Sequence, residues 1–256
     1  MSFTPGQRIA ISNQEAATDT ADTDLTLQVY LLGSVEFETA LTLQRRLAYE
    51  VAGNRSAAAL ILCEHPSLIT MGRQASWRHI DADPQELRDR RLEVRWVNRG
   101  AGCILHVPGQ LAIYPILPLD RLNLGLRAYQ EQLHRVIIAT LDDFMIRGKV
   151  VSGQSSVSVS GRPIADCGTA VRNWVSYYGA YFNINPDLSI YRELRPGGCV
   201  MTSLERERHG PLRPALVRDR LLEHFTAQFG TSRTSLFTDH PHLHRKARRN
   251  ALVTPS

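Results

Sequence analysis

The chain has 256 residues, of which 43% are hydrophobic and 21% are charged. This length suits one large domain or two small ones, and the composition is that of a soluble globular protein. No apolar run approaches the roughly 18 residues that a membrane span requires, and the first residues lack the basic and apolar segments of a signal peptide. These features exclude a membrane protein, and we expect a cytoplasmic location.

The net charge is +5, and a compact basic cluster lies near the C-terminus. Such clusters bind nucleic acid or are simply solvated, and an acidic protein partner would explain a mildly basic enzyme equally well. No recognition helix, zinc finger or RNA-binding aromatic motif accompanies the cluster, so we expect no nucleic-acid partner. The cluster consists of Arg245, Lys246, Arg248 and Arg249.

The first half of the chain alternates short apolar runs with helical patterns. Residues 1–24 are polar and aperiodic, which is typical of a disordered extension. Strands are predicted at 25–32, at 57–62 and, after Cys63-Glu64-His65-Pro66, at 68–71. Helices are predicted at 36–51 and at 83–90, where Asp83-Pro84 supplies a cap and a first-turn proline.

The stretch 97–115, VNRGAGCILHVPGQLAIYP, is the centre of the pattern. Apolar runs before and within it are cut by a glycine-rich turn at residues 99–102 and by a Pro-Gly turn at residues 108–109. The order strand, glycine turn, strand, Pro-Gly turn, strand is typical of a segment whose backbone a ligand approaches closely. Arg99, His106 and Gln110 supply polar groups there. The alternative is an ordinary hairpin with a glycine turn.

The second half contains the strongest helical pattern, at 126–146, where apolar residues recur every three or four positions. A Val/Ser strand is predicted at 150–159, one or two strands at 164–184, a short helix at 187–191 and a final helix at 214–229. Strands outnumber helices, which indicates a mixed α/β sheet with packed helices. We expect one domain over residues 25–230, followed by a basic tail at 231–256.

Five segments, in order, together resemble the lipoyl (octanoyl) transferase family. Residues 99–110 resemble its R-G-G-x-x-T-Y-H-G-P-G-Q motif, with Ala101 at the third position and Val107 in place of a glycine. Residues 64–66 with 70–73 resemble its E-H-P and T-x-G-R segments. Residues 161–168 resemble G-R-K-I-A-x-x-G, 179–183 resemble H-G-x-A-L-N, and 196–204 resemble a shortened P-C-G…V-T-S-L. The resemblance covers roughly residues 25–230 and implies the lipoate/biotin protein ligase-like fold.

The resemblance implies an octanoyltransferase of lipoate biosynthesis that works through a Cys thioester. A cationic neighbour stabilises the nucleophilic thiolate near neutral pH in such enzymes. Here Gly197 occupies the position of the family's Cys, and Pro163 occupies that of its Lys. The chain has only two lysines, Lys149 and Lys246, and neither lies near that position in the sequence.

Three residues are candidates for the missing chemistry: Cys199 as the nucleophile, Arg162 as its cation and His106 as the proton carrier. Arginine can stabilise a thiolate but does not exchange protons near neutral pH, whereas imidazole titrates near ~6.5. Cys167 is a second thiol candidate, for which a structural role in a buried strand is favoured. Cys63 and Cys103 are expected to be packing residues.

By the same resemblance, three segments would frame the acyl pocket. Asp166 replaces a small residue there and is either a pocket residue or a surface carboxylate, and Tyr178 stands where the family has His. The framing residues are Arg99, Gly100, Ala101, Gly102, Cys103, Ile104, Leu105, His106, Asp166, Cys167, Gly168, Gly179, Ala180 and Tyr181.

The partners that the resemblance implies are octanoyl-acyl carrier protein and the lipoyl domains of 2-oxoacid dehydrogenase E2 subunits and glycine cleavage H protein. The four scattered cysteines indicate neither a zinc site nor a disulfide framework, and no phosphate-binding glycine motif is present. We therefore expect no metal and no cofactor. The rival hypothesis is an inactive relative that binds acyl groups or lipoyl domains. An ATP-dependent ligase is disfavoured because no lysine remains to hold an acyl-adenylate.

Overall fold

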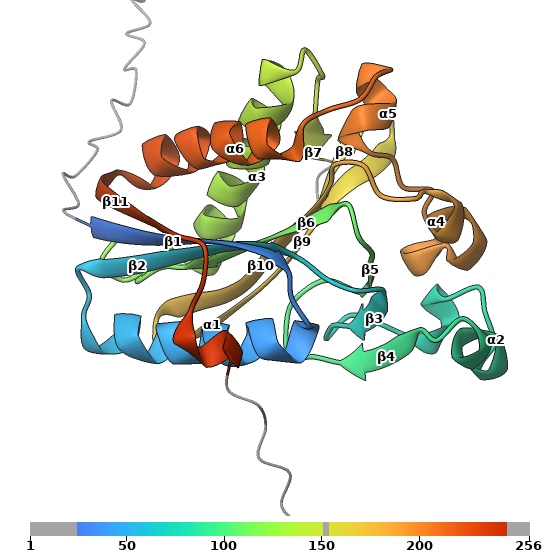
Figure 1. Cartoon of the computed structure of the whole chain (residues 1–256), viewed down its shortest axis with the longest axis horizontal. Coiled ribbons are helices and arrows are strands. Elements are labelled where there is room, and N and C mark those ends of the chain that lie inside the picture. Colours follow the sequence, from blue (N-terminus) through green and yellow to red (C-terminus); the bar gives the residue numbers. More distant parts are fainter. Residues whose placement is uncertain (1–24, 151–153, 245–256) are drawn as a thin grey trace, which may run out of the picture.

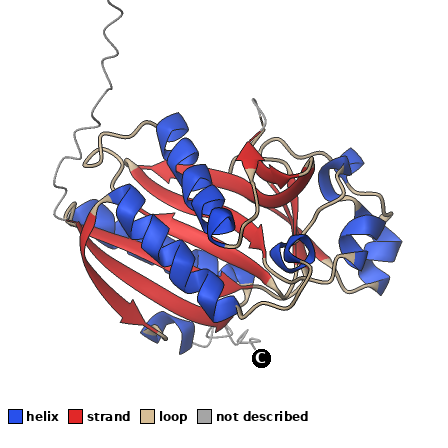
Figure 2. Ribbon diagram, turned by 90° about the horizontal axis from the view of Figure 1, so that it is seen from above, coloured by secondary structure: helices blue, strands red, loops and turns tan. Residues whose placement is uncertain are grey.

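A computed structural model describes residues 25–150 and 154–244. It has three layers: a mixed eight-stranded sheet, the helix α1 on one face, and the helices α3 and α6 on the other (Figures 1 and 2). None of the described helices is long and apolar enough to cross a membrane.

The large sheet has the strand order β11-β1-β2-β6-β10-β9-β8-β7. Strands β11, β1 and β2 run parallel to one another, and the remaining neighbours pair antiparallel. The strands of this sheet are β1 (Leu25–Ser34), β2 (Ala57–Glu64), β6 (Gln110–Ile116), β7 (Lys149–Val150), β8 (Ser156–Val159), β9 (Arg162–Arg172), β10 (Val175–Asn183) and β11 (Thr231–Phe237).

Alternation along the strands creates two separate cores. Leu111 and Ile113 of β6 face the core beneath α3 (Leu126–Asp143) and α6 (Pro214–Phe229). Ala112 and Tyr114 of the same strand face α1 (Phe37–Gly53). Apolar burial on both faces holds the strands of the candidate site in a fixed register.

A three-stranded sheet, with the order β4-β3-β5, lies beside the large sheet. Its strands are β3 (Leu68–Met71), β4 (Glu93–Trp96) and β5 (Cys103–His106). Its outer core includes Leu87 of α2 (Pro84–Asp89) and Tyr191 of α4 (Ser189–Leu194). The sequence signal for α2 is confirmed, because the Asp83 carboxylate accepts a hydrogen bond of 2.8 Å from the Glu86 N–H.

The C-terminal boundary differs from the sequence prediction. Residues 231–237, which we assigned to the tail, form β11 and extend the large sheet beyond β1. This edge strand is mostly exposed and lacks an apolar period, so no hydrophobic pattern marks it. The expected extension at 1–24 and the basic cluster at 245–249 lie outside the described residues.

Other elements also depart from expectation. The Val/Ser segment does not form one strand: Lys149–Val150 is β7 and Ser156–Val159 is β8, with residues 151–153 outside the described part. The prediction for 164–184 is confirmed as the hairpin β9–β10, and the final helix has the predicted bounds. Helix α5 (Leu204–Arg208) was not predicted, nor were the three-residue helical turns Trp77–His79 and Pro196–Gly198.

Candidate active site

Arg99 is the centre of the candidate site and is fully buried. Its guanidinium donates to the Thr70 carbonyl at 2.9 Å and to the Thr70 hydroxyl at 2.6 Å. It also donates to the carbonyls of Gly100 at 2.9 Å and Gly102 at 3.1 Å. Within the described chain no carboxylate forms an ion pair with it, so carbonyl oxygens hold this buried cation in place.

Gly168 on β9 makes room for the Arg99 side chain. A Cβ atom at this position would lie 2.9 Å from the Arg99 Cδ and 3.0 Å from the Gly100 carbonyl oxygen. The Gly100 N–H donates to the Thr169 carbonyl at 2.8 Å, which joins the Arg99 loop to β9. The glycine that ends the family-like segment 161–168 therefore permits the close approach of the Arg99 side chain to β9.

His106 is buried and neutral. Its Nε2 lies 2.8 Å from the Thr70 hydroxyl, and its Nδ1 lies 3.2 Å from the Gln110 Oε1. The Gln110 amide nitrogen donates to other groups, so Oε1 faces the ring and the proton resides on Nδ1. Burial, with the charges of His65 and Arg99 adding to it, lowers the pKa of His106 well below its usual value.

Aromatic rings pack around His106. The Tyr181 ring meets it edge-on at 4.6 Å between centroids, and the Phe37 ring lies at 5.6 Å. The Arg99 guanidinium lies 5.8 Å from the centre of the Tyr181 ring. Next to them, His65 Nδ1 lies 2.6 Å from the Val35 carbonyl and Nε2 lies 2.7 Å from the Tyr114 hydroxyl. These contacts hold the rings of Phe37, His65, His106, Tyr114 and Tyr181 in fixed positions on the α1 side of the sheet.

Asp166 is half-buried on β9, two residues before Gly168. The Ser156 hydroxyl donates to its Oδ1 at 2.6 Å. Burial raises the pKa of Asp166, and the Ser156 hydrogen bond and the charge of Arg99 oppose that rise. Asp166 is a partly exposed strand residue held by the neighbouring strand β8, and its place in the acyl pocket stays a prediction.

The expected pocket residues divide between three faces. Arg99, His106, Gly168 and Tyr181 approach one another between the two sheets. Cys167 and Ala180 instead pack in the core beneath α3, and Cys103 and Leu105 pack in the outer core of the small sheet. Side chains alternate along a strand, so a continuous run of residues cannot line one pocket.

Four side chains at this site were quoted in motifs but not assigned as site residues. Three of them belong to segments matched to the family and Tyr114 lies in the quoted stretch 97–115, and their signal was a polar or aromatic type in or next to a predicted strand. Their partners are up to 81 positions distant in sequence, so pairing was not predictable from spacing. They are His65, Thr70, Gln110 and Tyr114.

Cys199 is exposed, whereas the other three cysteines are buried. Burial raises the pKa of the Cys103 thiol to about 12 and raises the pKa values of Cys63 and Cys167 further. Those three thiols stay protonated and are poor nucleophiles. Of the chain's four cysteines, Cys199 alone is accessible to a large substrate.

Neither proposed helper of Cys199 contacts it through a hydrogen bond in the described chain. Arg162 instead forms an ion pair with Glu207 at 2.8 Å, and His106 bonds to Thr70 and Gln110. Arg162 therefore lacks the thiolate partner expected for it, because the Glu207 carboxylate is its nearest anion.

A chain of hydrogen bonds nevertheless leads from His106 toward the Cys199 loop. The two N–H groups of the Gln110 amide have three acceptors within reach: Asn183 Oδ1 at 3.0 Å, the Tyr191 hydroxyl at 2.8 Å and the Leu105 carbonyl at 3.1 Å. The Asn183 amide then donates to the Thr202 carbonyl at 3.1 Å. Buried polar networks of this kind fix the geometry of their members when every group is satisfied.

The chain continues from Thr202 to Arg162. The Thr202 hydroxyl donates to the same Glu207 oxygen that accepts from Arg162. The Thr202 N–H donates to the Pro163 carbonyl at 2.8 Å. Thr202 follows Cys199 by three residues, so His106 and Arg162 are the two ends of a network that anchors the Cys199 loop.

The Arg99 guanidinium is a buried cation that neutral carbonyls hold in place. The neutral imidazole of His106 adds no positive charge. Among the described residues, no group of three or more His, Cys, Asp or Glu side chains could hold a metal ion.

A cavity of about 880 Å³ lies elsewhere, between α1, the end of β4 and the hairpin β9–β10. None of the expected pocket residues lines it, although Asn98 and Tyr178 directly precede Arg99 and Gly179.

The sequence and the fold both match known proteins. The lipoyl protein ligase A/B catalytic domain matches residues 36–226. The octanoyltransferase of Syntrophotalea carbinolica is 32% identical over 80% of this chain and 95% of its own length. The octanoyltransferase of Chloroflexus aggregans is 35% identical over the same shares.

Solved structures agree on the fold. A bi-partite lipoate protein ligase from Thermoplasma acidophilum has a TM-score of 0.65 at 13% identity, covering 86% of this chain and 89% of its own. P. falciparum LipL1, in complex with lipoate, has a TM-score of 0.67 at 14% identity, covering 85% of this chain and 69% of its own. The predicted fold and family are confirmed: the chain belongs to the lipoyl protein ligase A/B catalytic domain family and is an enzyme of the acyltransferase class.

Proposed function

We propose that this chain is an octanoyltransferase of lipoate biosynthesis that uses Cys199 as its nucleophile. The donor is octanoyl-acyl carrier protein, and the acceptor is a lysine of the lipoyl domains of 2-oxoacid dehydrogenase E2 subunits and of glycine cleavage H protein. The family and the octanoyltransferase relatives support the reaction class. The single observation that supports the nucleophile is that Cys199 is exposed while Cys63, Cys103 and Cys167 are buried.

The reaction has two acyl transfers. In the first, the Cys199 thiolate attacks the octanoyl thioester carbonyl, and the carrier thiol leaves with the proton that Cys199 gave up. In the second, the neutral lysine amine attacks the Cys199 thioester, which forms the amide, and its proton returns to the Cys199 thiol. Both transfers pass through a negatively charged tetrahedral oxygen, which the Arg99 cation would stabilise.

In this proposal Arg162 and His106 position the Cys199 loop and take no part in proton transfer. The Pro163 position itself carries no lysine, and Lys149 stands two strands away, because it pairs with Ser158, which pairs with Pro163. The proposal therefore assigns no lysine as proton relay. Glu207 joins Arg162 to Thr202, and Gln110 and Asn183 join Thr202 to His106. This network fixes Thr202, three residues after Cys199, relative to His106 and Arg162, which supports the proposed position of the Cys199 loop.

Octanoylation of an isolated lipoyl domain tests the proposal. With octanoyl-acyl carrier protein as donor, we expect the unmodified protein to transfer the acyl group and Cys199→Ala to lose transfer. Cys167→Ala should keep it, since that thiol packs beneath α3 away from Arg99. Transfer by Cys199→Ala at the unmodified rate would refute the site, and an inactive unmodified protein would favour the binding-only rival.

A further inference from the structure

The cavity beside α1, which we name the α1 groove, has the chemistry of a second binding site. Its volume of about 880 Å³ lies within the range of small-molecule sites. Its base is apolar, with Leu41, Ala48 and Ala52 from one face of α1 and Val97 from the opposite wall.

Three guanidinium groups from three elements reach the groove. Arg45 comes from α1, Arg95 from β4 and Arg172 from the end of β9. Glu38 is the one carboxylate in the lining, and Glu93 beside it pairs with Arg95, so three cations and two anions leave a formal charge of +1. An anion is the favoured ligand on charge alone.

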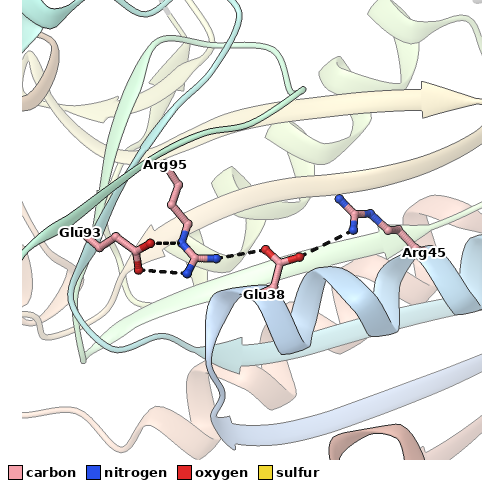
Figure 3. Close-up of polar contacts among 4 residues, drawn as sticks. All are labelled: Glu38, Arg45, Glu93 and Arg95. Carbon is pink, nitrogen blue, oxygen red and sulfur yellow. Dashed lines mark hydrogen bonds and ion pairs between the residues drawn. The ribbon is translucent and has the colours of Figure 1, made fainter. Parts of the chain in front are cut away.

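The three arginines differ in how many of their donors already have a partner, and Figure 3 shows two of them, Arg45 and Arg95. Arg95 donates twice to Glu93, at 2.7 Å and 3.0 Å, and once to Glu38 at 3.1 Å. Glu38 also lies 3.7 Å from an Arg45 nitrogen, which is beyond hydrogen-bond distance. The Arg95 guanidinium is therefore held in place by two carboxylates, while the N–H donors of Arg45 have no hydrogen-bond partner among the described residues.

Arg172 has the freest guanidinium. No acceptor for it exists among the residues that the structure describes, and the side chain is exposed. Arg45 and Arg172 thus offer planar donor pairs of the kind that bind carboxylate, phosphate or sulfonate groups.

Aromatic rings supply the rest of the wall. Tyr177 and Tyr178 line the groove with their rings 5.1 Å apart, and neither phenol oxygen has a hydrogen-bond partner within the described ranges. Tyr49 and Trp96 also line it and stay 74% and 58% exposed, which is unusual for rings of their size. Flat apolar surface beside free guanidinium groups fits a ring that carries an acid group.

The groove is separate from the candidate active site. Leu41 and Tyr178 belong to a small core cluster with Phe37, whose ring lies 5.6 Å from that of His106. Neither His106 nor Arg99 lines the groove. The inference therefore stands independently of the proposed octanoyl transfer.

We propose that the α1 groove binds a small organic anion that carries an aromatic ring, with the acid group on Arg172 and Arg45 and the ring against Tyr177, Tyr49 and Trp96. Nucleotides and aryl sulfonates or carboxylates share this chemistry.

Titration calorimetry on the full chain tests the proposal with defined probes. Adenosine 5′-monophosphate and naphthalene-2-sulfonate are the two anionic probes, and adenosine and inorganic phosphate carry the ring or the charge alone. We expect at least one anionic probe to bind with a Kd below about 1 mM and each half-probe to bind about tenfold more weakly. No binding of either anionic probe up to about 5 mM would overturn the proposal.

Three substitutions test whether the probe binds in the α1 groove and whether the positive charge of the groove attracts it. Arg172→Gln should weaken the bound anionic probe about tenfold, because a charge-assisted contact is lost. Arg147→Gln is the matched control, since Arg147 is an exposed arginine outside the groove lining, and it should change nothing. Glu38→Gln removes the groove's carboxylate and should strengthen binding. Equal effects of Arg172→Gln and Arg147→Gln, or weaker binding in Glu38→Gln, would refute the assignment.

Discussion

At the scale of single residues, burial decides the protonation of the histidines around Arg99. His65 donates from Nδ1 to the Val35 carbonyl and accepts at Nε2 from the Tyr114 hydroxyl, so its neutral form satisfies both contacts. Burial lowers the pKa of His65 to about 4, and the Val35 hydrogen bond opposes this only in part. A proton on Nε2 would only reverse the contact with Tyr114, whose hydroxyl oxygen can accept, so the cost of the charged form comes from its burial.

The burial of His65 predicts that the folded protein loses stability in acid. In the unfolded chain a histidine titrates near ~6.5, so as the pH falls the unfolded state takes up a proton that folded His65 refuses. The stabilising contribution is complete above pH 7 and is lost progressively between about pH 6.5 and pH 4. His65 alone should lower the free energy of unfolding by about 2 kcal/mol between pH 7 and pH 5.

Urea unfolding at the two pH values measures this loss. His65→Asn keeps a donor toward Val35 and removes the titrating ring. Its free energy of unfolding should therefore fall by about 2 kcal/mol less than that of the unmodified protein between pH 7 and pH 5. His106 shifts in the same direction and Asp166 in the opposite one, so the comparison of the two proteins, rather than either alone, isolates His65. An identical pH dependence in both proteins would show that His65 titrates normally.

A glycine on β10 gives the second residue-scale prediction. A Cβ at Gly179 would lie 2.0 Å from the Ile113 carbonyl oxygen and 2.7 Å from Pro115 Cδ, both in the neighbouring strand β6. Gly179→Ala should therefore destabilise the fold by about 3 kcal/mol, measured by denaturant unfolding. Gly33→Ala is the control in another strand, where nothing lies within 4 Å. Equal stability of the two variants would contradict the register of β6 and β10.

At the scale of elements, local signals predicted most helices and strands, while tertiary pairing determined the rest. Helix α6 and the hairpin β9–β10 carry strong apolar patterns and were predicted closely. Strand β11 was not, because six of its seven residues are exposed and only its pairing with β1 defines it. Apolar periodicity arises where one face of an element is buried. An exposed edge strand has almost no buried face, so its sequence shows no such period.

The same distinction applies to the candidate site. Arg99, His106, Gly168 and Tyr181 were placed together through ordered motifs, and they do meet. The alternation of strands could have excluded Cys167 and Ala180 from that face. The network of Gln110, Asn183, Thr202 and Glu207 joins segments that are far apart in sequence, so no local pattern contains it.

Strand β11 should contribute measurably to stability. It covers the edge of β1, and Phe237 stacks on Tyr30 with centroids 5.2 Å apart. Ending the chain after Gly230 should lower the free energy of unfolding by about 2 kcal/mol and expose β1 to aggregation. Ending it after His244 is the control, so the difference between the two truncations measures residues 231–244. No difference in thermal unfolding between them would show that β11 is dispensable.

At the scale of the whole molecule, the net charge of +5 bears on the proposed protein substrates. Acyl carrier protein and lipoyl domains are expected to be acidic, so their association should be steered by charge. Raising the salt from about 0.05 M to about 0.5 M should weaken binding of acyl carrier protein several-fold. Surface plasmon resonance across that range measures it, and an unchanged Kd would count against steering.

The most direct test of the nucleophile is the intact mass of the protein after incubation with octanoyl-acyl carrier protein. The account predicts one octanoyl adduct that hydroxylamine removes, that is absent from Cys199→Ala and that is retained in Cys167→Ala. An adduct that persists in Cys199→Ala, or no adduct on the unmodified protein at any pH, would contradict it.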